Sequence, residues 1–193
     1  MRYRSPEAGH MMRLYYFTNK KYGLAAIQDS RLKIARIGKL NDPFEFLGLD
    51  LERKDRKVMS AWKDEMDANY GIICMSVNWM HPLLWSHYAD KHKGMALGFD
   101  VVEDGTFTQV EYDCTRPTLD EIGLTSLDNL REDEMKKRVL FKKFEAWSYE
   151  TEYRAFCRLD EKCSLTGHYF LPFSDKIELA EVIVGHRCSV ARA

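Results

Sequence analysis

The sequence predicts an α+β fold, in which one domain holds a mixed or antiparallel sheet of about six or seven strands with three or four helices. Two observations lead to this fold class. Short apolar runs outnumber the segments with helical periodicity, and the two kinds do not alternate strictly along the 193 residues. The 45% hydrophobic content argues against disorder. We expect residues 14–193 to form the domain and residues 1–13 a flexible tail.

The N-terminal half begins with a predicted strand at 14–18, a short helix at 22–29 and an edge strand at 31–36. Asn41-Asp42-Pro43-Phe44-Glu45 is a predicted turn or ordered loop, because proline follows Asn and Asp. A helix is predicted at 55–70, where Met59, Trp62 and Met66 recur at helical spacing.

The next predicted elements are a buried strand at 72–77 and a helix at 82–92. Pro82 suits the first turn of this helix, and Gly94 suits its end. Further strands are predicted at 95–100, 107–112, 147–154 and 179–184, and a longer helix at 128–145.

The predicted strand at 147–154 is dense in charge. At a period of two residues, Glu150, Glu152 and Arg154 lie on one face, and burying them is costly unless they are paired. One interpretation is a structural Glu152–Arg154 pair. The other is a site in which a carboxylate at a strand end points into a cleft. The adjacent Lys142 and Lys143 are interpreted as the solvated end of a helix.

Two other segments are candidate sites, each with a structural alternative. The first is the segment 41–45. Its structural interpretation is a turn capped by Asn41 or Asp42, and its functional interpretation is a loop in which Asp42 and Glu45 bind a ligand. In the second, Trp85 and Tyr88 are core aromatic residues, or with His87 they form a platform for a planar ring such as a nicotinamide or a base.

Composition narrows the classes of function. A net charge of −1 does not favour polyanion binding by the whole chain, although it leaves a local basic groove open. The five cysteines are scattered without a Cys-x-x-Cys pair, which predicts free, buried thiols in a reducing compartment. No apolar run reaches the roughly 18 residues of a membrane helix. The prediction is a soluble, cytoplasmic protein that binds no membrane and no metal.

Several segments, in this order, resemble the bacterial domain-of-unknown-function 2971 family over about residues 14–185. They are Leu14-Tyr15-Tyr16-Phe17, Asn41-Asp42-Pro43-Phe44-Glu45, Cys74-Met75-Ser76, Leu84-Trp85-Ser86-His87-Tyr88-Ala89-Asp90, residues 92–100 and residues 147–154. The layout is also similar, more distantly, to the DNA-modifying ADP-ribosyltransferases. In that superfamily a glutamate on a late strand stabilises an oxocarbenium-like centre as nicotinamide leaves NAD.

The second resemblance implies a site for NAD or a related nucleotide. Glu152 matches the catalytic glutamate, with Arg154 or Glu150 orienting it. The residues expected to line the pocket are Tyr16, Trp85, His87 and Tyr88, with Asn41, Asp42 and Glu45 at its rim. The superfamily usually places a His or Arg on its first strand to grip NAD, and here Arg13 at the strand edge is the one candidate.

Two alternatives belong to other functional classes. The first is a non-catalytic module that binds a ligand or partner in a bacterial defence system, such as phage defence, or in a stress system. The second is a metal-dependent nuclease or phosphoesterase that uses Asp42, Glu45, Glu150 and Glu152. The sequence leaves open whether an acceptor is nucleic acid or protein. It also leaves open whether an oligomer, or a segment missing from the C-terminus, covers the last strand.

Overall fold

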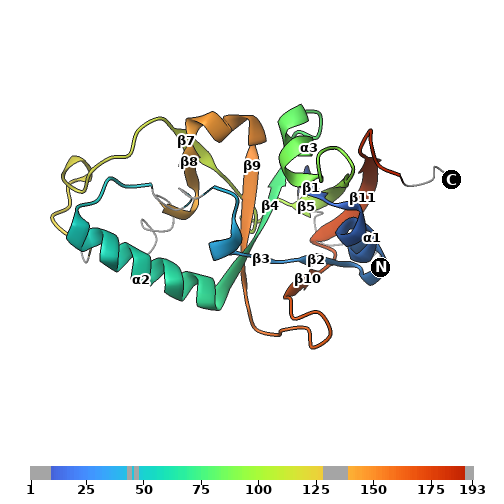
Figure 1. The fold of residues 1–193 in the computed structure, drawn as a ribbon, viewed down its shortest axis with the longest axis horizontal. Coiled ribbons are helices and arrows are strands. Elements are labelled where there is room, and N and C mark those ends of the chain that lie inside the picture. Colours follow the sequence, from blue (N-terminus) through green and yellow to red (C-terminus); the bar gives the residue numbers. More distant parts are fainter. Residues whose placement is uncertain (1–9, 43–44, 46–47, 128–138, 190–193) are drawn as a thin grey trace, which may run out of the picture. The chain divides into compact units, whose positions relative to one another are not determined.

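The computed structural model describes residues 10–42, 45, 48–127 and 139–189 (Figure 1). The chain divides into two compact units. Unit 1 comprises Met1–Leu32, Met75–Phe107 and Pro172–Ala193, and unit 2 comprises Lys33–Cys74 and Thr108–Leu171. The prediction of a single domain stays a prediction.

The α+β prediction is confirmed. The α-helices of the described residues are α1 (Lys20–Asp29), α2 (Arg53–Asn69) and α3 (Pro82–Tyr88). Seven strands are hydrogen-bonded in the order β11-β5-β1-β4-β9-β6, with β3 also paired to β4. Their bounds are β1 (Met11–Thr18), β3 (Ala35–Arg36), β4 (Tyr70–Ser76), β5 (Met95–Val102), β6 (Thr108–Gln109), β9 (Glu152–Arg158) and β11 (Ile177–Val184). Strand β2 (Arg31–Lys33) pairs with β10 (Phe170–Pro172), and β7 (Glu111–Asp113) pairs with β8 (Lys142–Phe144).

In unit 1, strand β5 lies between β1 and β11 and is antiparallel to both (Figure 1). Helix α1 begins where the Asn19 side chain accepts a hydrogen bond from the Tyr22 amide. Gly23 lets this helix approach β5 closely, because a Cβ atom there would lie 2.4 Å from Met95 Sδ. Helix α3 packs on β1 through Trp85, whose ring meets the Phe17 ring edge-on at 5.3 Å.

Two boundaries in unit 1 differ from the prediction. Strand β1 begins at Met11, so residues 11–13 belong to a strand rather than to the predicted tail. Helix α3 ends at Tyr88, not at residue 92. The reason is a run of three residues, Asp90, Lys91 and His92, with φ angles of 46°, 53° and 69°, which an α-helix does not accommodate.

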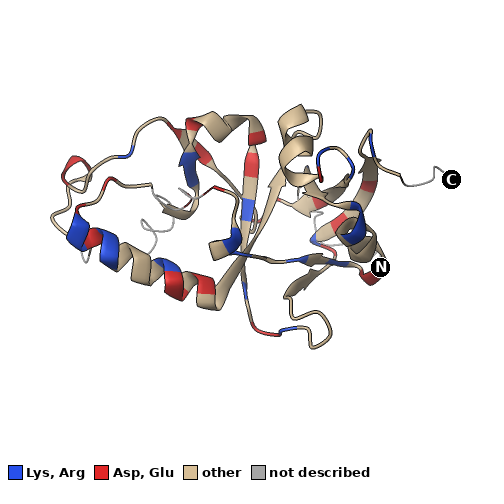
Figure 2. Cartoon of the chain, viewed as in Figure 1, with Lys and Arg blue, Asp and Glu red and all other residues tan. Residues whose placement is uncertain are grey.

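Unit 2 is built around a hydrophobic core of its own. Helix α2 contributes Met59, which is buried with Ile72 of β4 and Leu140 in the loop before β8. The charged residues of α2 are mostly exposed, as expected for a surface helix (Figure 2). The predicted helix at 55–70 is therefore confirmed.

The strand predicted at 147–154 is confirmed over Glu152–Arg154 and wrong before it. Glu145–Glu150 form the 3₁₀ helix η5, Thr151 has a φ of 42°, and β9 begins only at Glu152. The predicted helix at 128–145 is wrong over Lys142–Phe144, which form β8 in parallel pairing with β7. Tertiary pairing overrides local helical propensity there. Residues 128–138 lie outside the described residues.

Candidate functional site

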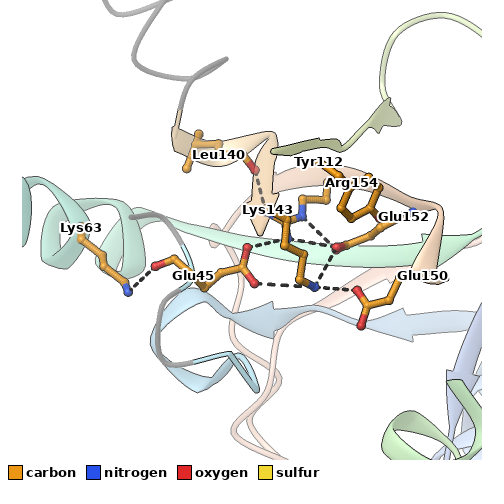
Figure 3. Close-up of polar contacts among 8 residues, drawn as sticks. All are labelled: Glu45, Lys63, Tyr112, Leu140, Lys143, Glu150, Glu152 and Arg154. Carbon is orange, nitrogen blue, oxygen red and sulfur yellow. Dashed lines mark hydrogen bonds and ion pairs between the residues drawn. The ribbon is translucent and has the colours of Figure 1, made fainter. Parts of the chain in front are cut away.

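The centre of unit 2 is a buried network around the guanidinium of Arg154 (Figure 3). Its Nε and Nη2 donate to the two oxygens of Glu152, at 2.8 and 3.0 Å. Nη2 also donates to Glu45 Oε1 at 2.5 Å, and Nη1 to the Leu140 carbonyl at 2.7 Å. The side chain is 1% exposed. A buried guanidinium is tolerated here because carboxylates and a carbonyl accept its hydrogen bonds.

Lys143 is the second cation of the network. Its Nζ lies 2.6 Å from Glu150 Oε2, 3.1 Å from Glu152 Oε2 and 3.8 Å from Glu45 Oε2. It also lies 5.0 Å from the centre of the Trp147 ring. Three carboxylates thus surround two cations, and the cluster carries a formal charge of −1 when all five groups are ionised.

Local backbone geometry brings Glu150 and Glu152 to the same ammonium. In a regular strand, period-two alternation would place them on one face. Here Glu150 ends η5, and the left-handed Thr151 turns the chain before β9 begins. The Glu152 amide donates to the Tyr112 hydroxyl at 2.8 Å, which fixes the start of β9. A turn, rather than strand alternation, therefore joins the two carboxylates.

The Glu45 end of the network is held from two sides. The Glu45 amide donates to the Asp42 carbonyl at 3.1 Å, which is the backbone contact of a turn. Lys63 of α2 donates from Nζ to the Glu45 carbonyl at 3.0 Å (Figure 3). The turn predicted at residues 41–45 is supported by the first contact, while residues 43–44 lie outside the described part.

Electrostatic coupling fixes the charge states. Burial by itself raises the pKa of Glu152, but Arg154 and Lys143 outweigh it and lower that pKa from 4.5 to about 2. Burial lowers the pKa of Lys143, yet Glu152, Glu150 and Glu45 together raise it above its ordinary value. Glu152 is therefore an anion, and Lys143 a cation, across the physiological pH range.

Burial also affects two uncharged neighbours of Glu152. The pKa of Tyr112 is raised to about 12, by burial and by the negative charges of Glu152 and Glu150. The pKa of the Cys74 thiol is raised well above its ordinary value, by burial and then by Glu152. Both groups stay protonated at neutral pH. Cys74 is thus a neutral hydrogen-bond donor to Glu152 and not a nucleophile.

A cavity of about 30 Å³ adjoins the network. Asp42, Glu45 and Lys143 line it together with Arg116 and Lys142. Lys142 faces Asp113, with Nζ and Oδ2 3.4 Å apart. The cavity therefore has carboxylates and cations in its wall, whereas Glu152 is not one of its lining residues. Within residues 10–42, 45, 48–127 and 139–189, no group of three or more His, Cys, Asp or Glu residues is arranged to hold a metal ion.

The structure brings together four of the predicted site residues, Glu45, Glu150, Glu152 and Arg154. Asp42 is also buried and lines the adjoining cavity, while Asn41 beside it is exposed. The assignment of these residues to ligand binding or catalysis stays a prediction.

The remaining predicted residues belong to unit 1. Trp85 is 7% exposed and packs in a core cluster, which fits the core interpretation of this residue. Tyr16 and Tyr88 are half-buried and His87 is exposed. Arg13, the candidate for a grip on NAD, is paired with Asp100 at 2.7 Å and with Glu181 at 2.5 Å. Their roles as ligand-binding residues stay predictions.

Sequence reasoning missed the residues that complete the network. Lys143 was interpreted as a solvated helix end, but its side chain is 6% exposed and lies among three carboxylates. Tyr112 and the Leu140 carbonyl were not singled out. Recognition of 142–144 as a strand would have placed Lys142 and Lys143 on opposite faces, so that one of the two lysines could be assigned to the interior.

Some predictions of general character can be compared with the described residues. All five cysteines are free thiols. The prediction that they are buried is wrong for Cys114, which is exposed, whereas the other four residues are half-buried and burial raises the pKa of the Cys74 and Cys157 thiols. Among the helices that the structure describes, none has the length and apolar character needed to cross a membrane.

Comparison with known proteins yields one family. No curated protein and no solved structure matches the chain. One family model matches residues 84–155. This segment holds four of the five charged side chains of the network, namely Lys143, Glu150, Glu152 and Arg154. Residues 84–155 match the model of a family described as a protein of unknown function (DUF2971), which confirms, over these residues, the family resemblance predicted from the sequence.

Proposed function

We propose that this protein is an ADP-ribosyltransferase-like enzyme that consumes NAD or a related nucleotide, with Glu152 as the carboxylate that stabilises the reacting ribose. The observation that carries the proposal is the charge state of the network. Glu152 is held ionised at the start of a strand, inside a buried cluster whose five described side chains are three carboxylates and two cations.

A fixed carboxylate out of contact with water favours a positive charge placed nearby. Coulombic attraction is stronger in a low-dielectric interior than in water, and a fixed group loses no energy in reorienting during the reaction. Arg154 holds both oxygens of Glu152 in place from the same strand. The carboxylate is thus preorganised before any ligand arrives.

Cleavage of the N-glycosidic bond of NAD creates such a charge. The bond between the ribose C1′ and the nicotinamide nitrogen breaks, and its electron pair leaves with nicotinamide, which becomes neutral. The ribose is left with oxocarbenium character, which Glu152 stabilises. Water, or the nucleophile of an acceptor, then adds to C1′ and loses a proton.

Other residues have supporting roles in this proposal. Glu45 and Lys143 line the cavity and are the members of the network that a ligand in it would meet first. Arg116 and Lys142, also in the wall of the cavity, supply positive charge suited to a phosphate group. Arg154 orients Glu152 and does not itself meet the ligand.

The test is an assay of nicotinamide release. Purified protein is incubated with NAD, with and without candidate acceptors, and nicotinamide is quantified over time. Release by the wild type, lost in Glu152→Gln and kept in Glu65→Gln, is the expected result. Glu65 is the matched control because it is an exposed glutamate of α2 in the same unit.

Folding of each variant is checked by circular dichroism at the assay temperature, so that lost activity is not confused with lost structure. Nicotinamide release that survives in a folded Glu152→Gln variant would remove Glu152 from the proposed mechanism. No release by the wild type with any nucleotide or acceptor offered would contradict the enzymatic function.

A second candidate function, a non-catalytic binding module, is favoured by one observation. Both oxygens of Glu152 already accept hydrogen bonds, and the side chain is 6% exposed. In a module of this kind the network is a rigid base for the cavity, which binds a small polar ligand. It predicts that Glu152→Gln lowers the melting temperature while the wild type releases no nicotinamide. An unchanged melting temperature in this variant would contradict it.

A further inference from the structure

The surroundings of the Lys143 ammonium have the chemistry of a binding site for an organic cation. Its Nζ has two carboxylate oxygens within 3.1 Å and a third at 3.8 Å (Figure 3). The centre of the Trp147 ring lies 5.0 Å from the same atom. Carboxylates with an aromatic face are the groups that recognise alkylammonium ions. Here the cation they hold belongs to the chain itself.

Lys143 differs from the other cation of the network in its setting. Arg154 is 1% exposed and is bound on all sides by Glu152, Glu45 and a carbonyl. Lys143 also lines the cavity of about 30 Å³, which Arg154 does not. A flexible four-carbon stem and an adjoining space let an ammonium withdraw, which a guanidinium locked by its planar fork does not do.

We propose that Lys143 is a positioning residue whose ammonium occupies, in the unliganded protein, the place where Glu150 and Glu152 later stabilise the positive charge of a ligand. The ammonium keeps the two carboxylates charged and close together, and it withdraws into the cavity when the ligand cation enters. We call the three carboxylates and the Trp147 ring around this position the cage. The inference rests on the proposed function only for the identity of the ligand cation, which is the developing charge on the ribose.

The experiment removes the Lys143 ammonium from the cage and supplies a small organic cation in its place. Lys143→Ala removes the side chain beyond Cβ, and propylammonium has the size and charge of the part removed. We expect propylammonium chloride to raise the melting temperature of Lys143→Ala by about 3–6 °C at ten times its dissociation constant. Propanol at the same concentration tests size without charge, and sodium chloride tests ionic strength.

The matched control is Lys142→Ala. Lys142 is the preceding residue and is paired with Asp113, 3.4 Å away. Propylammonium is expected to leave the melting temperatures of this variant and of the wild type within about 1 °C of those in sodium chloride, because both salts screen exposed charges alike. Equal stabilisation of all three proteins, or stabilisation of Lys143→Ala by propanol alone, would overturn the inference.

A second variant keeps the inference testable if Lys143→Ala does not fold. Lys143→Met retains the apolar stem and removes the charge. The groups that then face Glu152 are Arg154 on β9, Glu150 on η5, Glu45, Cys74 on β4 and Tyr112 on β7. With one cation left for three carboxylates, a carboxyl group takes up a proton more readily in the folded state than in the unfolded state.

A folded-state pKa above the unfolded value contributes stability at low pH, and this contribution is lost as the pH rises. The melting temperature of Lys143→Met should therefore fall further below that of the wild type at pH 8 than at pH 5. A difference that does not change with pH would show that Lys143 only fills space. The outcomes are separate from those of the proposed function, because neither measurement uses NAD. If propylammonium raises the melting temperature of Lys143→Ala but the wild type releases no nicotinamide, the proposed enzymatic function is contradicted and the inference about the cage stands.

Discussion

Arg154 and Glu152 lie two residues apart on one strand and share a two-point contact, with Nε 2.8 Å from Oε1 and Nη2 3.0 Å from Oε2. Side chains at this spacing point to the same side of a strand. A contact of this kind is usual at an exposed surface, but here both partners are almost wholly buried. Glu45 then adds a third member to the pair from a distant part of the sequence.

Removal of Arg154 is predicted to be strongly destabilising. Arg154→Met removes the closer cation of Glu152 and Glu45 and leaves Lys143 to pair with all three carboxylates of the network, so the free energy of unfolding should fall by about 3–5 kcal/mol. Urea denaturation at pH 7 measures it. Arg158→Met on the same strand is the control, since its exposed pair with Asp160 at 3.5 Å should contribute no more than about 0.5 kcal/mol. Similar losses in both variants would show that burial of the Arg154 pair does not matter.

Glu152 is predicted to stabilise the protein in a pH-dependent way. Its pKa is lowered from 4.5 to about 2 in the folded state, so its contribution is present above pH 4.5 and is lost as the pH falls toward 2. The difference in unfolding free energy between wild type and Glu152→Gln should therefore be larger at pH 6 than at pH 3. Urea denaturation at several pH values gives this difference. A constant value across the range would contradict the lowered pKa.

The Tyr112 hydroxyl is predicted to matter as a hydrogen-bond acceptor. Tyr112→Phe leaves the buried Glu152 amide without the acceptor that it now has at 2.8 Å, at a cost of about 1–3 kcal/mol. Thermal denaturation followed by circular dichroism measures the loss. In Tyr153→Phe, the control, the hydroxyl lost makes an exposed contact of 3.4 Å with Gln109, and a change below about 0.5 kcal/mol is expected. The prediction fails if the two variants melt alike.

Thr151 is predicted to require a positive φ angle. Proline fixes φ near −65°, so Thr151→Pro, at a residue whose φ is 42°, should cost more than about 3 kcal/mol and separate Glu150 from Glu152. Thr151→Gly reaches the same angle without a Cβ clash and should stay within about 1 kcal/mol of the wild type. Comparison of the two melting temperatures is the measurement. A proline variant as stable as the glycine variant would show that the turn is not needed.

Much of the fold followed from local patterns. Met59, Trp62 and Met66 predicted α2 because an amphipathic helix repeats its apolar residues every 3.6 positions. Strands β4 and β5 were predicted from short apolar runs for a similar reason. The segment 142–151 was not predictable in this way. Its local signals predicted a helix up to residue 145 and a strand from residue 147, and pairing of β8 with β7 overrides the first of them.

The sequence by itself determined the class of the fold, the resemblance of residues 84–155 to one family and the charged residues Glu150, Glu152 and Arg154, because periodicity and residue type are local properties of the chain. The tertiary structure alone decided that Glu45 and Lys143 join them and that all five are buried. The physical reason is that the pairing of a buried charge depends on distance in space. Glu45 lies 109 positions from Arg154 along the chain, yet 2.5 Å separates Nη2 from Oε1.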